Sequence, residues 1–235
     1  MTAKVTIITP TYNKPTYFAE CARSVLAQTY QDWVWWVVLN CWCWPDAYEQ
    51  STIWADNRIV PIWFPVTEGL ERQYSHTPAR IVNWLYPKVQ TPYIYFLADD
   101  DLIDREGLEK LVEELDVPFG VAYNADAVYG RMEVKDEQPD GTFKHACWCY
   151  EGSDVGGDTS IKPDCLLDGG QVLHTKALWE KATADGWKLP DDKANAAHND
   201  GILLNRLSQF ATFHYVPQQI ATHRRTKQSS FHKPQ

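Results

Sequence analysis

The stretch Tyr93-Ile-Tyr-Phe-Leu-Ala-Asp-Asp-Asp101 decides the fold, because an apolar run ends in three consecutive carboxylates. Residues 93–98 have the composition of a buried strand. In open α/β sheets, ligands bind at the carboxyl ends of the strands. Three adjacent carboxylates repel one another, which favours a bound cation, and oxygen ligands suit Mg²⁺ or Mn²⁺. An acidic helix start with Asp104 as its N-cap is the competing interpretation, and this stretch alone does not separate the two.

Strand and helix patterns alternate on both sides of this stretch. The run 33–39 is continuously apolar, as in a central parallel strand, whereas Pro61 places the strand 58–64 at a sheet edge. Residues 9–15 are rich in turn formers, and Pro15 suits a first helical turn. The expected strands are 5–8, 33–39, 58–64 and 93–98, and the expected helices start near Pro15 and cover 77–85 and 104–115. This order predicts an α/β fold with a doubly wound, mostly parallel central sheet flanked by helices.

The character of the sequence changes after residue 118. Residues 136–160 are rich in Gly, Asp, Glu and Ser and predict long loops or a flap. The remaining expected elements are a strand in 119–134, a turn at 168–170, helices at 175–184 and 200–207, and a last strand at 213–216 before a polar, basic tail. We therefore expect a single domain with two parts, residues 1–118 and residues 119–235.

Charge and hydropathy exclude several classes of protein. The chain has 235 residues, 44% hydrophobic and 23% charged, with a formal net charge of −9. That charge argues against broad electrostatic binding to nucleic acid or to anionic membranes. The sequence contains no apolar run long enough for a transmembrane helix, and its first residues lack the apolar core of a secretory signal. These features predict a cytoplasmic location.

Six cysteines include two Cys-x-Cys pairs, Cys41 with Cys43 and Cys147 with Cys149. On strands, each pair would point to one face, and four thiolates can hold structural zinc. Zinc sites usually have two to four residues between cysteines, so packed, reduced thiols are the favoured interpretation.

Four motifs in this order resemble family 2 glycosyltransferases of the GT-A fold. They are Val5-Thr-Ile-Ile-Thr-Pro-Thr-Tyr-Asn13, Ser24-Val-Leu-Ala-Gln-Thr-Tyr30, Tyr95-Phe-Leu-Ala-Asp-Asp-Asp-Leu102 and Asn199-Asp-Gly-Ile-Leu-Leu-Asn-Arg206. The resemblance covers most of residues 4–116 and, more loosely, 165–225. It implies a GT-A domain with a smaller acceptor-side region, a nucleotide-sugar donor that is usually a UDP-sugar, a Mn²⁺ or Mg²⁺ ion, and transfer with inversion. Chemically, a cation stabilises the leaving diphosphate and a carboxylate takes the proton of the acceptor hydroxyl.

The same resemblance implies roles for individual residues. Asp200 corresponds to the catalytic base, and Asp101 is the first candidate for the metal, with Asp99 and His223 as further ligands and His214 as the runner-up to His223. The donor-binding candidates are Pro10, Thr11, Tyr12, Asn13, Asn40, Arg80, Asp99, Asp100, Arg224 and Arg225, the last two as a lid over the diphosphate. The acceptor-side candidates are Asp168, Gly169, Gly170, His198 and Asn199.

Alternatives remain at several of these positions. Asp200 is equally placed to be a simple N-cap, Arg80 to be an exposed helix residue, and the basic C-terminal residues to be a mobile, solvated tail. Ala98 and Asn40 stand where the family usually carries Asp.

A non-catalytic nucleotide-sugar or glycan binding protein on the same fold is therefore the alternative function. A nucleotidyltransferase ranks lower, because residues 9–15 contain no glycine for a phosphate loop. The acceptor is open among a glycan, a lipid-linked glycan, a protein and a modified DNA base, with the net charge against the last. Trp148, Trp179 and Trp187 are candidates for stacking on a sugar ring.

Overall fold

The computed structural model describes residues 3–12, 14–39, 52–64, 77–116, 125–157, 159–163, 166–191 and 198–227. Asn13 and Asn40, predicted to bind the donor, lie outside these ranges, as do Cys41, Cys43 and Cys165.

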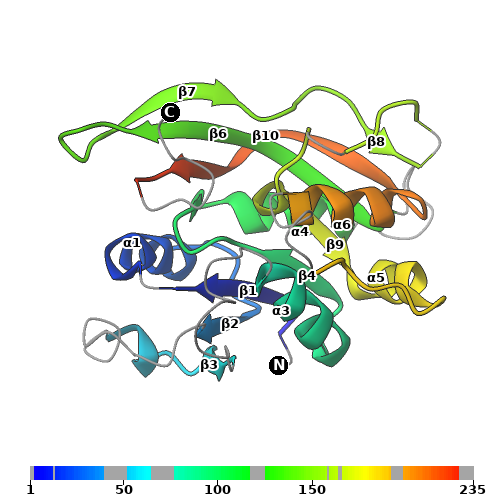
Figure 1. The fold of residues 1–235 in the computed structure, drawn as a ribbon, viewed down its shortest axis with the longest axis horizontal. Coiled ribbons are helices and arrows are strands. Elements are labelled where there is room, and N and C mark those ends of the chain that lie inside the picture. The colour runs from blue at the N-terminus through cyan, green and yellow to red at the C-terminus, as the bar shows by residue number, and fades with distance from the viewer. Residues whose placement is uncertain are drawn as a thin grey trace.

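One sheet runs through the described part of the chain, with the strand order β3-β2-β1-β4-β9-β6-β10-β5 (Figure 1). Two further strands extend it, because β7 pairs with β6 and β8 pairs with β10. The strands are β1 Val5–Thr11, β2 Trp33–Leu39, β3 Ile59–Trp63, β4 Tyr93–Phe96, β5 Leu102–Ile103, β6 Ala127–Glu137, β7 Phe143–Trp148, β8 Val155–Gly156, β9 Val172–Thr175 and β10 Thr212–Arg225.

Most residue pairs in this sheet are parallel. They lie in the β3-β2-β1-β4 part and between β6 and β10, while the pairs that involve β5, β7, β8 and β9 are antiparallel. The α/β fold class with a mostly parallel central sheet is thereby confirmed. The strand β9 pairs with β4 on one side and β6 on the other, so both predicted parts of the chain share one sheet. The functional division at residue 118 stays a prediction.

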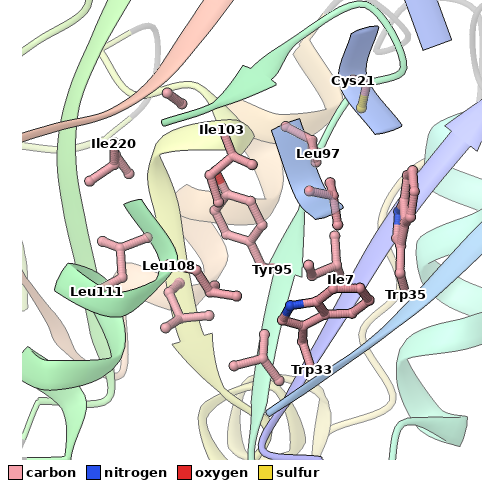
Figure 2. Packing of buried hydrophobic residues seen from close by; sticks show 14 of the residues in the cluster. Ile7, Cys21, Trp33, Trp35, Tyr95, Leu97, Ile103, Leu108, Leu111 and Ile220 are labelled. Atoms are coloured by element: carbon pink, nitrogen blue, oxygen red, sulfur yellow. The ribbon is translucent and has the colours of Figure 1, made fainter. Parts of the chain in front are cut away.

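Helices cover both faces of the sheet, as the periodicity of their apolar residues predicts. The described helices are α1 Pro15–Leu26, α3 Thr77–Leu85, α4 Gly107–Leu115, α5 Lys176–Thr183 and α6 Asn199–Ser208, with the 3₁₀ turns η1 Thr52–Ala55, η3 Tyr86–Lys88 and η4 Gly169–Gln171. One core lies under α1 and α4, and Figure 2 shows Trp33, Tyr95 and Leu111 packed there. The other core lies under α3, α5 and α6.

The strand β1 is longer than the sequence predicts and includes Pro10 and Thr11 of the turn-rich stretch 9–15. Proline lacks the N–H that a central strand needs. The carbonyl of Ile8 accepts from Leu97, so residue 8, and by alternation residue 10, faces β4. The β1–β4 pairing ends at Ile8 and Phe96. Pro10 therefore breaks no ladder bond, and the strand carries Thr11 as far as the carboxylates.

The helix α4 begins at Gly107 rather than at Asp104, so Asp104 is not its N-cap. The preceding residues form β5 against β10, and Asp104 N–H donates to the carbonyl of Ile220. Gln28 accepts from the N–H of Leu108 and thereby satisfies one of the first helical donors. A Cβ at residue 107 would lie 2.5 Å from the oxygen of Ile220, so glycine permits this close approach of α4 to β10.

Two corrections concern the second part of the chain. The expected loops at 136–160 contain a hairpin, in which β7 runs antiparallel to β6 along its outer side (Figure 1). The expected last strand at 213–216 is only the start of β10, which pairs with β6 as far as Arg225. Register shifts between Val216 and Ala221 allow the strand to continue past the polar residues at which the sequence predicts its end.

No described helix is long and apolar enough to span a lipid bilayer.

His174 of β9 is buried in the second core beside the ring of Tyr86. Its Nδ1 lies 3.0 Å from the carbonyl of Thr175, and its Nε2 has no hydrogen-bond partner among the described residues. Burial lowers the pKa of His174 to about 4. The folded state therefore resists protonation, whereas the unfolded chain takes up the proton near pH 6.5.

We predict that this histidine makes the fold sensitive to acid. Its contribution to stability is complete above pH 6.5 and is lost as the pH falls toward 4, by about 1.4 kcal/mol per pH unit. Denaturant unfolding of the native protein and of His174→Phe at neutral pH and at mildly acidic pH measures the difference. The native protein should lose about 2–3 kcal/mol more than the variant; equal losses would show that His174 is readily protonated in the fold.

Candidate functional site

The carboxylates of Asp99, Asp100 and Asp101 follow β4 and are buried, with exposed fractions of 6%, 6% and 1%. They lie where the parallel strands β1 and β4 end, as the sequence predicts. Buried like charges are unfavourable unless cations or hydrogen-bond donors compensate them. Each of the three carboxylates has a different set of partners, and these partners distinguish what each one does.

Asp99 holds the segment that follows β1. The N–H of Tyr12 donates to its Oδ2 at 3.2 Å, and the side chain of Thr11 donates to the same carboxylate. Burial raises the pKa of Asp99 to about 6, against the lowering effect of the Lys14 charge. Pro10 and Thr11 are thus fixed beside the acidic run, and the ring of Tyr12 remains 41% exposed there.

Asp100 is neutralised by Lys14. The Nζ of Lys14 lies 2.6 Å from Oδ2 of Asp100 and 3.5 Å from Oδ1 of Asp99. Thr226 donates to Oδ2 of Asp100 from the end of β10, at 3.3 Å. Burial alone would lower the pKa of Lys14, but the charges of Asp99 and Asp100 outweigh it and the pKa is raised. Lys14 is therefore a charged group built into the site.

Arg224 is a buried structural residue, whereas the resemblance implies a lid over the diphosphate. Its side chain is 2% exposed. The guanidinium donates to the backbone carbonyl of Asp100, to the carboxylate of Glu20 and, at 3.2 Å, to the carbonyl of Tyr17. Because β10 continues to residue 225, Arg224 is enclosed between that strand and α1.

Its basic neighbours are also engaged with acidic residues. Arg225 pairs with Asp136 at 2.7 Å, and Lys227 pairs with Glu137 at 3.4 Å. The described basic residues up to 227 are therefore paired with carboxylates and do not form a mobile, solvated tail.

Asp101 belongs to a cluster with His223 and Asp168. The N–H of Arg224 donates to Oδ1 of Asp101 at 2.9 Å, and Nδ1 of His223 lies 3.2 Å from its carboxylate. The same nitrogen lies 3.9 Å from Oδ2 of Asp168. The negative charge of Asp101 raises the pKa of His223 to about 10, although burial opposes this. The imidazolium therefore serves as the counter-ion of the two carboxylates.

The donor atoms of this cluster fit a divalent cation. One ligand atom from each of Asp101, Asp168 and His223 lies within 4.8 Å of the other two. Two carboxylate oxygens and one imidazole nitrogen suit Mn²⁺, and carboxylate oxygens also suit Mg²⁺. Binding of a metal would displace the proton of His223. Among the described residues this is the one such cluster, and it contains no cysteine.

The turn η4 places Asp168 at this cluster. Asp168 caps the turn, since its Oδ1 accepts from the N–H of Gly170 at 2.8 Å. The backbone N–H of Asp168 in turn donates to Oε1 of Gln171 at 2.9 Å. Gln171 also donates to the carbonyl of Gly130 in β6, while the Tyr95 hydroxyl donates to the carbonyl of Gly170. Burial raises the pKa of Asp168, with a lowering contribution from His223 and a raising one from Asp101.

Asp200 lies on the other side of the same turn, in the first turn of α6. A Cβ at Gly169 would lie 3.7 Å from the Cβ of Asp200, and the N–H of Gly201 donates to its Oδ1 at 2.9 Å. Burial raises the pKa of Asp200 to about 6, and the charge of Asp168 adds to the effect. The backbone hydrogen bonds at the helix N-terminus favour the carboxylate form and do not offset this effect.

The remaining predicted residues are distributed around this centre. Asn199 is buried at the start of α6, and His198 before it is exposed. Arg80 of α3 forms an ion pair with Asp191 at 3.1 Å. His214, the runner-up ligand, lies 2.9 Å from Asp154 near the start of β10, whereas His223 near its end is the histidine in the metal-ligand cluster.

Sequence reasoning missed three features of the site. Lys14 and Glu20 were not singled out, because a lysine after a turn and a glutamate on a helix are usually solvated. Asp168 was expected on the acceptor side, and its contact with His223 depends on tertiary structure. The signal that could have found Asp168 is the pattern Asp-Gly-Gly-Gln171, which is typical of a capped, rigid turn.

Comparison with known proteins finds a matching family and similar folds. A sequence model of the family described as Glycosyl transferase family 2 matches residues 6–160. Protein CgeD of Bacillus subtilis (strain 168) is 25% identical over 232 residues, which are 97% of this chain and 52% of CgeD. The chain thus spans about half the length of this curated relative.

Solved structures of S. aureus TarS share the fold. The structure of TarS 1-349 superposes with a TM-score of 0.69 at 14% identity and covers 94% of this chain and 60% of that one. The complex of TarS 1-349 with UDP-GlcNAc gives a TM-score of 0.65 at 16% identity, with 97% and 60% covered.

The buried ion pair of Lys14 gives a test of this site. In metal-free protein, Lys14→Met leaves Asp99 and Asp100 without their cation, and we predict a loss of about 3 kcal/mol in the free energy of unfolding. In the double variant Lys14→Met with Asp100→Asn, one charge is removed with its partner, so about half of the loss should return. Chemical denaturation of the four proteins of this cycle measures the coupling. Additive effects of the two substitutions would contradict the assignment of Asp100 to Lys14.

Proposed function

The chain belongs to glycosyl transferase family 2, and from this premise we propose that it transfers a sugar from a nucleotide-sugar to an acceptor hydroxyl, with inversion at the anomeric carbon. The observation that carries the proposal is the turn η4. Asp168 on one side of it joins the cation cluster, and Gly169 beside it abuts Asp200. A site for a leaving diphosphate and a base for an incoming hydroxyl are therefore held by one rigid turn.

Asp200 is our candidate for the general base. Its carboxylate is partly shielded from solvent and carries a raised pKa of about 6 because of burial and Asp168. A base with a pKa in this range is mostly ionised at neutral pH and still basic enough to take a proton from a hydroxyl in the transition state. The backbone N–H groups of Gly201, at 2.9 Å, and of Gly169 donate to this carboxylate and orient it for its role as proton acceptor.

Asp101, Asp168 and His223 are the residues that would hold Mn²⁺ or Mg²⁺. When bound, the cation supplies positive charge to the leaving nucleoside diphosphate. The chain prepares its position with the N–H of Arg224, which fixes one oxygen of Asp101. Asp99 and Asp100 contribute by holding the loop after β1 and the cation of Lys14. Of the acidic run, Asp101 alone then contacts the metal, and Asp99 positions the donor-binding loop.

A UDP-sugar is the donor that we propose. The support is that the related fold of TarS has been solved with UDP and with UDP-GlcNAc. In this chain the backbone N–H of Tyr12 donates to Asp99, and its exposed ring offers a surface for the nucleotide. Four residues near Asp200 are proposed for the acceptor side. They are Gly169 and Gly170 of η4 and His198 and Asn199 at the start of α6. A cytoplasmic location fits a nucleotide-sugar donor and is part of the same proposal.

The base is tested by Asp200→Asn, an isosteric change that removes the proton acceptor. With a panel of UDP-sugars and Mn²⁺, we predict that release of UDP from the reactive donor falls by about 10²–10⁴-fold. Stabilisation by UDP with Mn²⁺ in a thermal shift assay should be unchanged. Asp185→Asn, which removes an exposed carboxylate paired with Arg206, is the matched control and should retain full activity. Full turnover by Asp200→Asn would exclude it as the base, and donor binding without any turnover in the native protein would favour the non-catalytic alternative.

A further inference from the structure

We propose that the exposed face of β6 and β7 binds a neutral carbohydrate chain as the acceptor, with Trp148 as the stacking platform. This inference rests on the proposed function. It concerns residues 127–148, which lie between the sequence motifs quoted above. It selects a glycan from the four acceptor classes that the sequence left open.

One row of side chains on β6 leads from the core under α6 to Trp148. Tyr129, Arg131 and Glu133 alternate along β6 and so share one face of the sheet. At the start of the row, Tyr129 packs in the same core as the leucines of α6, the helix that carries Asp200. Farther along β6, Glu133 lies opposite Trp148 of β7. The exposed part of the row is therefore a continuation of the face that α6 covers.

The segment that follows β7 lies against the turn of the catalytic centre. The N–H of Tyr150 donates to the carbonyl of Leu166 at 3.3 Å, and Gln171 of η4 donates to the carbonyl of Tyr150, also at 3.3 Å. The ring of Tyr150 stacks near that of Tyr129, with 6.4 Å between their centroids. Trp148 is thus two residues from a segment that is hydrogen-bonded to the turn between Asp168 and Asp200.

Trp148 has the surroundings of a stacking platform. Its side chain is 37% exposed although it is large and apolar. The guanidinium of Arg131 lies 4.3 Å from the ring centroid, and the ring of His145 lies 5.4 Å away. These neighbours fix the indole in place without covering it fully. An aromatic ring that is held in this way, with donors and acceptors at its edge, suits the C–H face of a sugar ring and its hydroxyl groups.

The charges around Trp148 favour a neutral ligand. Arg131 pairs with Glu151, and Lys135 pairs with Glu133 at 3.0 Å. His145 also contacts the carboxylate of Glu133, at 3.1 Å. Arg131 and Lys135 each already have a carboxylate partner, so the described residues around Trp148 offer no excess positive charge to a nucleic acid or another polyanion. Paired charges still donate and accept hydrogen bonds at their free positions, as a chain of hydroxyl groups requires.

Binding to immobilised oligosaccharides tests the proposal. The probes are cellohexaose, maltohexaose and chitohexaose as neutral chains, a hyaluronan hexasaccharide as an anionic chain, and single-stranded DNA. We predict that the native protein binds at least one neutral probe and that Trp148→Ala weakens this binding by about tenfold. Trp148→Phe keeps an aromatic face and should retain most of the binding. Trp84→Ala is the matched control, because Trp84 on α3 is 38% exposed and lies under Lys88.

Turnover of the donor separates this inference from the proposed function. Release of UDP from the donor in water should be the same in Trp148→Ala as in the native protein, because the ring contacts of Trp148 among the described residues are with Arg131 and His145. Failure of the native protein to release UDP would count against the proposed function. The binding of oligosaccharides by the native protein and by Trp148→Ala would still test the carbohydrate surface independently. Equal binding by Trp148→Ala and Trp84→Ala, binding of no neutral probe, or a preference for hyaluronan or DNA would each overturn the inference.

Discussion

Buried negative charge at the carboxyl ends of β1 and β4 is the constraint on which the rest of the structure depends. Residues 99–101 are buried there, and the half-buried Asp168 and Asp200 lie beside them. Such a group is stable only if other parts of the chain deliver positive charge and N–H donors to it. Lys14 comes from the segment before α1, and His223 comes from the far end of β10. A divalent cation would complete the compensation at Asp101 and Asp168.

The long strand β10 is the element that makes this compensation possible. Near its end it brings the ring of His223 and the N–H of Arg224 to Asp101, and just beyond it Thr226 reaches Asp100. It can do so because β5, which directly follows the acidic run, pairs with it. A change that shifts β10 along β5 would therefore separate the cation site from its ligands without touching any ligand. Gly107, which lets α4 approach the carbonyl of Ile220, is one residue that maintains this register.

Local patterns in the sequence predicted the parallel part of the sheet and most of the helices. The apolar run 33–39 forms a buried strand, as its composition predicts. The apolar face of α1 that contains Phe18 and Ala22 packs on the sheet, as its helical spacing predicts. Long-range features were out of reach. The burial of Arg224 depends on Glu20, some two hundred residues earlier, and the continuation of β10 depends on a partner strand and on register shifts. The association of Asp168 with Asp101 is likewise decided by the pairing of β9 with β4 and β6.

The central claim is that Asp101, Asp168 and His223 form a cation site beside the proposed base. Anomalous X-ray scattering from crystals grown with Mn²⁺ and UDP tests it most directly, because it locates the metal without reference to activity. The account predicts a manganese peak coordinated by these three side chains and by oxygens of the diphosphate. A peak at another place, or a UDP-bound site without manganese at a concentration that saturates binding in solution, would contradict it.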